Sequence, residues 1–159
     1  EVGIALTADA EKAPYPVTLR LVPPVLTLGI GCRRGTSADA IARAVEGTLR
    51  AFRLHPRAVF QVSTIDLKKE ETGLLEFCRT RELSLRVWTA EELAETPGVF
   101  TPSSFVRSVT GVDNVCERAA VRAGGKLLVP KRAADGVTVA VARRPWAVSF
   151  EEGEETPCE

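Results

Sequence analysis

Short apolar runs alternate with amphipathic stretches along most of the chain, and this alternation predicts the order of its elements. Residues 25–30 form an apolar run that is interrupted by glycine, as in a buried parallel strand. Apolar residues then recur at three- and four-residue steps from 41 to 52, which predicts an amphipathic helix. The same order repeats, with strands predicted at 58–65 and 83–88 and helices at 70–81 and from 89 to a point before Pro97.

The second half of the chain predicts further helices and a closing hairpin. A short helix is expected at 103–109, and Asp113 is expected to cap a helix that ends at residues 124–125. Strands at 126–130 and 137–143 flank Asp135-Gly136, a frequent hairpin turn. The chain is therefore predicted to be an α/β protein in three layers. Its central sheet should be mostly parallel or mixed, with about five strands, helices on both faces and a C-terminal β-hairpin.

The two ends of the chain differ from this pattern. Residues 1–24 contain Pro14, Pro16 and the pair 23–24, which we expect to break any helix or strand ladder, so they are interpreted as a linker or arm. Residues 25–150 are the predicted domain, and 151–159 an acidic flexible tail. The chain contains no methionine. We therefore expect it to be a piece of a longer polypeptide, with residues 1–24 leading from a missing upstream region.

Composition narrows the classes of partner. Hydrophobic residues make up 45% of the chain and charged residues 26%, as in folded globular proteins. The 21 basic and 21 acidic residues cancel, so no overall field favours nucleic acid or an anionic membrane. We expect a cytoplasmic protein without either partner. Four widely spaced cysteines and a single histidine predict no metal site and no bound cofactor.

The strongest chemical signal is the turn at residues 29–36, Gly-Ile-Gly-Cys-Arg-Arg-Gly-Thr. Glycines allow a ligand to approach the backbone, amide groups at a helix start bind anions, and Arg33 and Arg34 add positive charge. Thr36 with Asp39 resembles a capping box. The dinucleotide pattern would need glycine at position 34. Spacing alone leaves open whether these glycines bind a ligand or only form a tight turn.

Two later segments carry further polar groups. Residues 63–71 run from a strand end through Thr64 and Lys68 to acidic residues, and parallel topology would place Lys68 at the same sheet edge as Arg33 and Arg34. A solvated helix start is the alternative. Residues 110–120 place a glycine turn before an alanine-rich helix that carries Glu117. This carboxylate could act as a general acid or base, or it could only favour the helix N-terminus.

Together, the segments 29–36, 64–71 and 110–120, in this order, resemble the C-terminal domain of the CbiG/CobE family of cobalamin-biosynthesis proteins. Residues 101–103 and 137–142 also fit, so the resemblance covers about residues 25–143. The Cys-Arg-Arg and Asp-Asn-Val-Cys-Glu sequences are more similar to the hydrolase branch than to the CobE branch. Complete hydrolases carry a larger upstream region, which implies that this chain is a C-terminal domain of such an enzyme.

The resemblance implies a role in cobalt-precorrin-5A hydrolysis, in which a lactone on a cobalt tetrapyrrole is opened and acetaldehyde leaves. The partners implied are this tetrapyrrole and the missing upstream domain. Glu117 is the implied catalytic residue. The implied substrate-binding residues lie on the three segments and are Gly29, Gly31, Cys32, Arg33, Arg34, Gly35, Thr36, Thr64, Lys68, Gly111 and Asn114. Two alternatives are a CobE-like carrier that does not catalyse, and a nucleotide-binding regulator.

Overall fold

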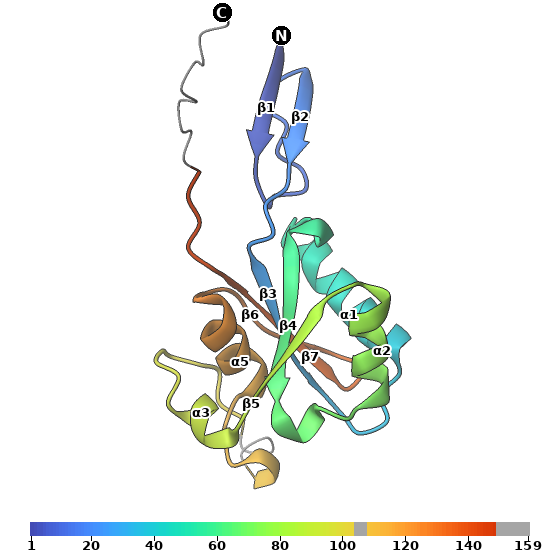
Figure 1. Ribbon diagram of the computed structural model, residues 1–159, viewed down its shortest axis with the longest axis vertical. Helices are drawn as coiled ribbons and strands as arrows, with labels where there is room; N and C mark the ends of the chain where they lie inside the picture. The colour runs from blue at the N-terminus through green and yellow to red at the C-terminus, as the bar shows by residue number, and fades with distance from the viewer. Residues whose placement is uncertain (104–107, 149–159) are drawn as a thin grey trace, which may run out of the picture.

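The computed structural model describes residues 1–103 and 108–148, and its centre is a five-stranded mixed sheet in the order β5-β4-β3-β7-β6 (Figure 1). Three strands are parallel to one another, and the last two form an antiparallel hairpin beside β3. The strands are β3 Leu26–Cys32, β4 Val59–Ile65, β5 Ser84–Trp88, β6 Lys126–Ala134 and β7 Val137–Arg143. The predicted sheet and its C-terminal hairpin are confirmed.

Helices cover both faces of this sheet, as predicted. The helices α1 and α2 lie on one face, and α3 and α5 lie on the other (Figure 1). Two single-turn 3₁₀ helices, η1 and η2, precede and follow β4. The bounds are α1 Ala38–Ala51, η1 Pro56–Ala58, η2 Asp66–Lys68, α2 Thr72–Thr80, α3 Ala90–Ala94 and α5 Val115–Gly124.

The two faces of the sheet differ in side-chain size. Alternate residues of β3 and β7 point to opposite faces, so Leu28 and Val139 pack under α1 with other branched side chains. On the other face, small residues meet α5. Ala140 and Ala142 of β7 pack against Cys116 and Ala120 of α5, and Gly29 of β3 lies beneath the helix. Consequently α5 lies much closer to the backbone of the sheet than the bulkier first face permits.

Residues 1–24, predicted to be an arm without strands, contain a two-stranded parallel ribbon. Its strands are β1 Val2–Leu6 and β2 Val17–Leu21, and it projects from the body of the domain (Figure 1). The expectation that prolines break any ladder was wrong because Pro14 and Pro16 lie between the strands, in their connection. Residues 7–11 attach the ribbon to the domain through a β-bridge from Asp9 to Leu54.

Several local boundaries differ from the prediction. The strand β3 continues to Cys32 and does not end at residue 30. Ser37, whose side chain accepts from the backbone N–H of Ala40, caps α1 in place of Thr36, because the Thr36 hydroxyl donates to the carbonyl of Arg33. The predicted helix at 103–109 includes residues 104–107, which lie outside the described residues. The predicted tail at 151–159 also lies outside them.

Candidate functional site

The parallel strands β3, β4 and β5 end on the same side of the sheet, which we call the carboxyl edge. The turn 33–36 follows β3 there, and η2 follows β4. The order in which strands are added to the sheet reverses at β3. The strands β4 and β5 lie on one side of β3, and β7 and β6 lie on the other. Crevices at such points of reversal are common ligand sites in open α/β sheets.

The backbone of the turn 33–36 is held by three hydrogen bonds within the protein. The Arg33 N–H donates to the carbonyl of Gly136 in the β6-β7 hairpin at 3.1 Å, and the Thr36 N–H donates back to Arg33 at 3.3 Å. Gly35 has a φ of 73°, a left-handed conformation that suits glycine. The Gly35 N–H donates to Glu71 Oε2 at 3.0 Å. Three of the amides predicted to bind an anion therefore have acceptors within the protein.

Glu71 is the anion at this turn. Besides the Gly35 amide, its carboxylate accepts from Lys68 Nζ at 3.1 Å, and its side chain is only 13% exposed. The hydrogen bond from Gly35, followed by that from Lys68, lowers the pKa of Glu71 below its usual value. Sequence reasoning missed this role, although the three-residue spacing of Lys68 and Glu71 was a usable signal. Lys68 lies at the predicted edge, but it pairs with Glu71.

Arg33 and Arg34 are exposed cations of the carboxyl edge. Within residues 1–103 and 108–148, neither guanidinium forms a salt bridge or a side-chain hydrogen bond. Arg34 lines a groove of about 590 Å³ between the turn and α2. Glu70, Glu71 and Glu76 line the same groove. The groove thus combines one arginine with three acidic residues.

Three residues predicted to bind substrate form packing contacts within the domain. A Cβ on Gly29 would lie 1.8 Å from the carbonyl oxygen of Cys116, so this glycine lets α5 approach β3. A Cβ on Gly31 would lie 2.6 Å from Thr138 Oγ1. Thr64 is fully buried and donates to the carbonyl of Ile30 at 2.6 Å. Because both glycines lie inside β3, no glycine-rich loop supports the nucleotide-binding alternative.

The cysteines of the site region are poor nucleophiles. Burial raises the pKa of the Cys32 thiol, although nearby Lys68 opposes that rise. Burial also raises the pKa of Cys116 to about 11. Since the thiolate is the reactive form, neither side chain is primed for attack at neutral pH.

Glu117 lies inside the domain, at the first turn of α5, with 1% of its surface exposed. Its carboxylate accepts three hydrogen bonds. Thr101 donates through its N–H at 2.7 Å and its hydroxyl at 2.9 Å, and the Lys131 N–H donates at 2.6 Å. Glu117 therefore ties α5 to the segment before residue 104 and to β6.

The neighbours of Glu117 extend this cluster. Asn114 caps α5 by accepting from the Glu117 N–H at 2.9 Å, and it donates to the Thr101 carbonyl at 2.8 Å. The expected cap, Asp113, instead accepts from Arg118 at 3.0 Å. Arg118 also donates to three backbone carbonyls at residues 93, 94 and 96, near the end of α3. Gly111, at a φ of 78°, is exposed and has open space around it.

Within residues 1–103 and 108–148, no three side chains of histidine, cysteine, aspartate or glutamate gather as a metal site would require. In the same ranges, no helix combines the length and apolarity needed to cross a bilayer.

A family model described as "Cobalamin synthesis G C-terminus" matches residues 26–142. The chain belongs to this family. It is 34% identical over 139 residues to the cobalt-precorrin-5A hydrolase of Salmonella typhimurium, and 36% identical over 126 residues to that of Priestia megaterium. These alignments cover 87% and 78% of the chain but only 39% and 33% of the relatives. The chain thus spans a little over a third of the length of such hydrolases.

Smaller relatives are matched over more of their length. The chain is 30% identical to the protein CobE of a Sinorhizobium species, covering 79% of that protein. A crystal structure of CobE, from the cobalamin (vitamin B12) biosynthetic pathway, aligns at a TM-score of 0.69 and 32% identity, over 77% of this chain and 92% of that one. A cobalamin biosynthesis protein G homologue from Sulfolobus solfataricus, at 19% identity and a TM-score of 0.62, shares the fold over 91% of this chain and 50% of its own.

Proposed function

We propose that this domain acts in cobalamin biosynthesis as the C-terminal part of a cobalt-precorrin-5A hydrolase. The parent reaction opens a lactone on the cobalt tetrapyrrole and releases acetaldehyde. Membership of the family and the two hydrolase relatives support this proposal. The domain's part in it is to bind the macrocycle at the carboxyl edge.

The observation that carries the proposal is the pair of exposed arginines on a braced turn. Glu71 and the Gly136 carbonyl fix the backbone that bears Arg33 and Arg34, while both guanidinium groups remain exposed. Guanidinium groups form paired, charge-assisted hydrogen bonds with carboxylates. The acetate and propionate groups of a tetrapyrrole are the ligands proposed for them.

Glu117 fits a positioning role better than direct proton transfer. Its carboxylate is enclosed and already accepts from three donors, whereas a general base must reach the proton that it removes. We therefore assign Glu117 and Asn114 to holding Thr101 against α5. Gly35, Thr36 and Lys68 similarly position the arginines.

Acetaldehyde release tests this function. The chain alone, and a polypeptide in which it follows the upstream part of a hydrolase relative, are incubated with cobalt-precorrin-5A, and acetaldehyde is measured over time. In the joined protein, the pair Arg33→Ala and Arg34→Ala should raise the KM about tenfold or more, because charged hydrogen bonds to the substrate are lost. Unchanged kinetics would contradict the role of the arginines.

A carrier without catalysis is the second candidate, favoured by the alignment over 92% of the CobE chain. In that case, the joined protein would bind the tetrapyrrole with an affinity that depends on Arg33 and Arg34, but no acetaldehyde would form. Equilibrium binding measured beside the acetaldehyde assay separates the two functions.

A further inference from the structure

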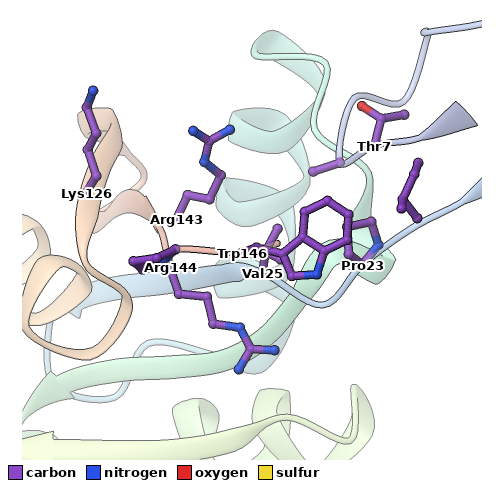
Figure 2. A pocket seen from close by; sticks show the side chains of 10 residues that line it. Thr7, Pro23, Val25, Lys126, Arg143, Arg144 and Trp146 are labelled. Carbon is purple, nitrogen blue, oxygen red and sulfur yellow. The ribbon is translucent and has the colours of Figure 1, made fainter. Parts of the chain in front are cut away.

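A second cleft lies at the opposite end of the sheet, where β3 begins and β7 ends (Figure 2). We call it the amino-edge cleft, and its volume is about 500 Å³, within the usual range for ligand sites. One wall is the segment 6–8, which leaves the ribbon. The lining residues beyond that segment are Pro23, Val25, Lys126, Arg143, Arg144, Pro145 and Trp146.

Two cations stand side by side in this cleft. Lys126 of β6 and Arg143 of β7 are direct cross-strand partners, and Figure 2 shows both side chains on the same side of the sheet. Like charges directly opposite each other destabilise an antiparallel pair. Within residues 1–103 and 108–148, neither side chain has a salt bridge or hydrogen bond, and no acidic residue lines the cleft. A bound anion would relieve this repulsion.

Arg144 has a different role. Its guanidinium lies 4.3 Å from the centre of the Phe60 ring, and its backbone N–H donates to the carbonyl of Val25 at 3.0 Å. In Figure 2, the side chain of Arg144 points away from that of Arg143. Arg144 thus fixes the end of β7 against β3, and Arg143 and Lys126 are left to face a ligand.

Trp146 supplies a flat apolar surface beside these charges. Its side chain lies next to Pro23 and Val25 in Figure 2. Val25 is only 2% exposed, whereas Trp146 is 44% exposed. An indole that is anchored on a buried floor and still partly open can stack on a planar ring.

We propose that the amino-edge cleft binds an anionic ligand with a flat ring, with its acid groups on Lys126 and Arg143 and its ring on Trp146. This site goes beyond the proposed function, because it lies at the opposite edge from Arg33 and Arg34. A carboxylated tetrapyrrole and a nucleotide share this chemistry, and the experiment separates these two sources.

Titration of the chain with uroporphyrin, which carries carboxylates on every pyrrole ring, tests the site by calorimetry and tryptophan fluorescence. ATP and inorganic phosphate are titrated in parallel. The chain has two tryptophans, so Trp88→Phe leaves Trp146 as the only indole that can report binding. The double variant Lys126→Ala and Arg143→Ala should raise the Kd for the flat anion about 30-fold, through the loss of two charge-assisted hydrogen bonds.

A matched double variant removes the same charge elsewhere. Arg43→Ala on α1 and Arg79→Ala on α2 delete two exposed arginines outside the lining of either cleft, and the Kd should stay within about twofold. An equal loss in both double variants would overturn the inference, because it would mean attraction by net charge alone. Absence of saturable binding to any probe, or a Kd unaffected by Lys126→Ala with Arg143→Ala, would also overturn it.

Two further measurements identify the class of ligand and check that each variant is folded. Saturable quenching of Trp146 by uroporphyrin assigns the ligand to carboxylated tetrapyrroles, and tighter binding of ATP assigns it to phosphates. Thermal unfolding of each variant shows that the fold is kept. Binding at the amino-edge cleft and acetaldehyde release are measured separately, so either proposal can fail while the other stands.

Discussion

The two ends of the central sheet offer contrasting surfaces to a ligand. At the carboxyl edge, most polar groups already have partners, with Lys68 and the Gly35 amide both bound to Glu71. At the amino-edge cleft, Lys126 and Arg143 face each other without a counter-charge among the described residues. The carboxyl edge is thus stabilised by internal hydrogen bonds, whereas the two cations of the amino-edge cleft are unpaired among the described residues. Exposed cations at the two ends are therefore not equivalent, because Arg34 shares its groove with three glutamates, whereas no acidic residue is among the described residues that line the amino-edge cleft.

The largest expected effect comes from the carboxylate that braces the carboxyl edge from within. Glu117→Ala would remove a buried carboxylate and leave three partly buried donors, on Thr101 and Lys131, without their acceptor. The free energy of unfolding should fall by about 3–5 kcal/mol. Urea unfolding measures this change. Glu76→Ala, at an exposed position on α2, should alter it by less than about 0.5 kcal/mol. A loss below about 1 kcal/mol for Glu117→Ala would remove the distinction between the two ends.

Gly29 is the second test of the braced end. An alanine methyl would lie 1.8 Å from the Cys116 carbonyl, so α5 would have to shift, at a cost of about 3 kcal/mol. The matched control has the opposite sign. Gly47 lies within α1 with open space around it, so Gly47→Ala should stabilise the protein by about 0.5–1 kcal/mol. Thermal melts of the two variants on one day give the comparison. Equal and small changes in melting temperature for the two variants would show that α5 does not pack directly against the backbone of β3.

Glu71 tests the turn that carries Arg33 and Arg34 at the carboxyl edge. Glu71→Gln should reduce the free energy of unfolding by about 2 kcal/mol at pH 7, because a carboxylate that accepts from Gly35 and Lys68 is lost. The lowered pKa of Glu71 sets the pH dependence. Its contribution is present above the usual glutamate pKa of about 4.3 and is lost as the pH falls through the lower folded value. Unfolding of both proteins from pH 7 to pH 3 should show their difference shrinking, and a constant difference would argue against the clamp.

The smallest expected effect concerns Cys32 at the same edge. Burial is the largest cause of the raised pKa of this thiol, and the negative charge of Glu71 raises that pKa further. Glu71→Gln should therefore speed alkylation of Cys32 at pH 8 by about twofold. Mass spectrometry of the labelled peptides measures the rate at this residue alone. Lys126→Ala, at the other end of the sheet, should leave the rate unchanged, and a change there would show coupling between the ends.

The order of elements was predictable because each has a local pattern. Each pattern is formed by residues that are neighbours in the sequence. Examples are the branched residues of the strands, the helical spacing after residue 38 and the Asp135-Gly136 turn. The helix predicted from residue 89 was found in the same way, and Thr89 and Glu92 form its capping box. The ribbon was missed because proline content was read without regard to position, and Pro14 and Pro16 lie outside both strands.

The site was only partly predictable. Arg33 and Arg34 are exposed on the turn that the sequence singled out, but the partners of the other groups come from distant parts of the chain. Nothing in the sequence near Glu117 indicates that Thr101 and Lys131 supply its donors. Pairing between β6 and β7 likewise places Lys126 opposite Arg143 across the hairpin, a relation that depends on register. Local patterns give elements, whereas contacts across the fold decide what each side chain can bind.

The close seat of α5 on the sheet has a consequence for how the chain would tolerate change. A saturation mutagenesis map scored for folded yield should show a narrow intolerant stripe at Gly29, Ala119 and Ala120, where even a methyl group has no room or the surface is fully buried. Lys126 and Arg143 should be permissive in that map, since both are exposed. In a second map, scored for ligand binding, substitutions of Lys126 and Arg143 should instead be among the least tolerated. The difference between the two maps would separate the residues needed for folding from those needed for binding.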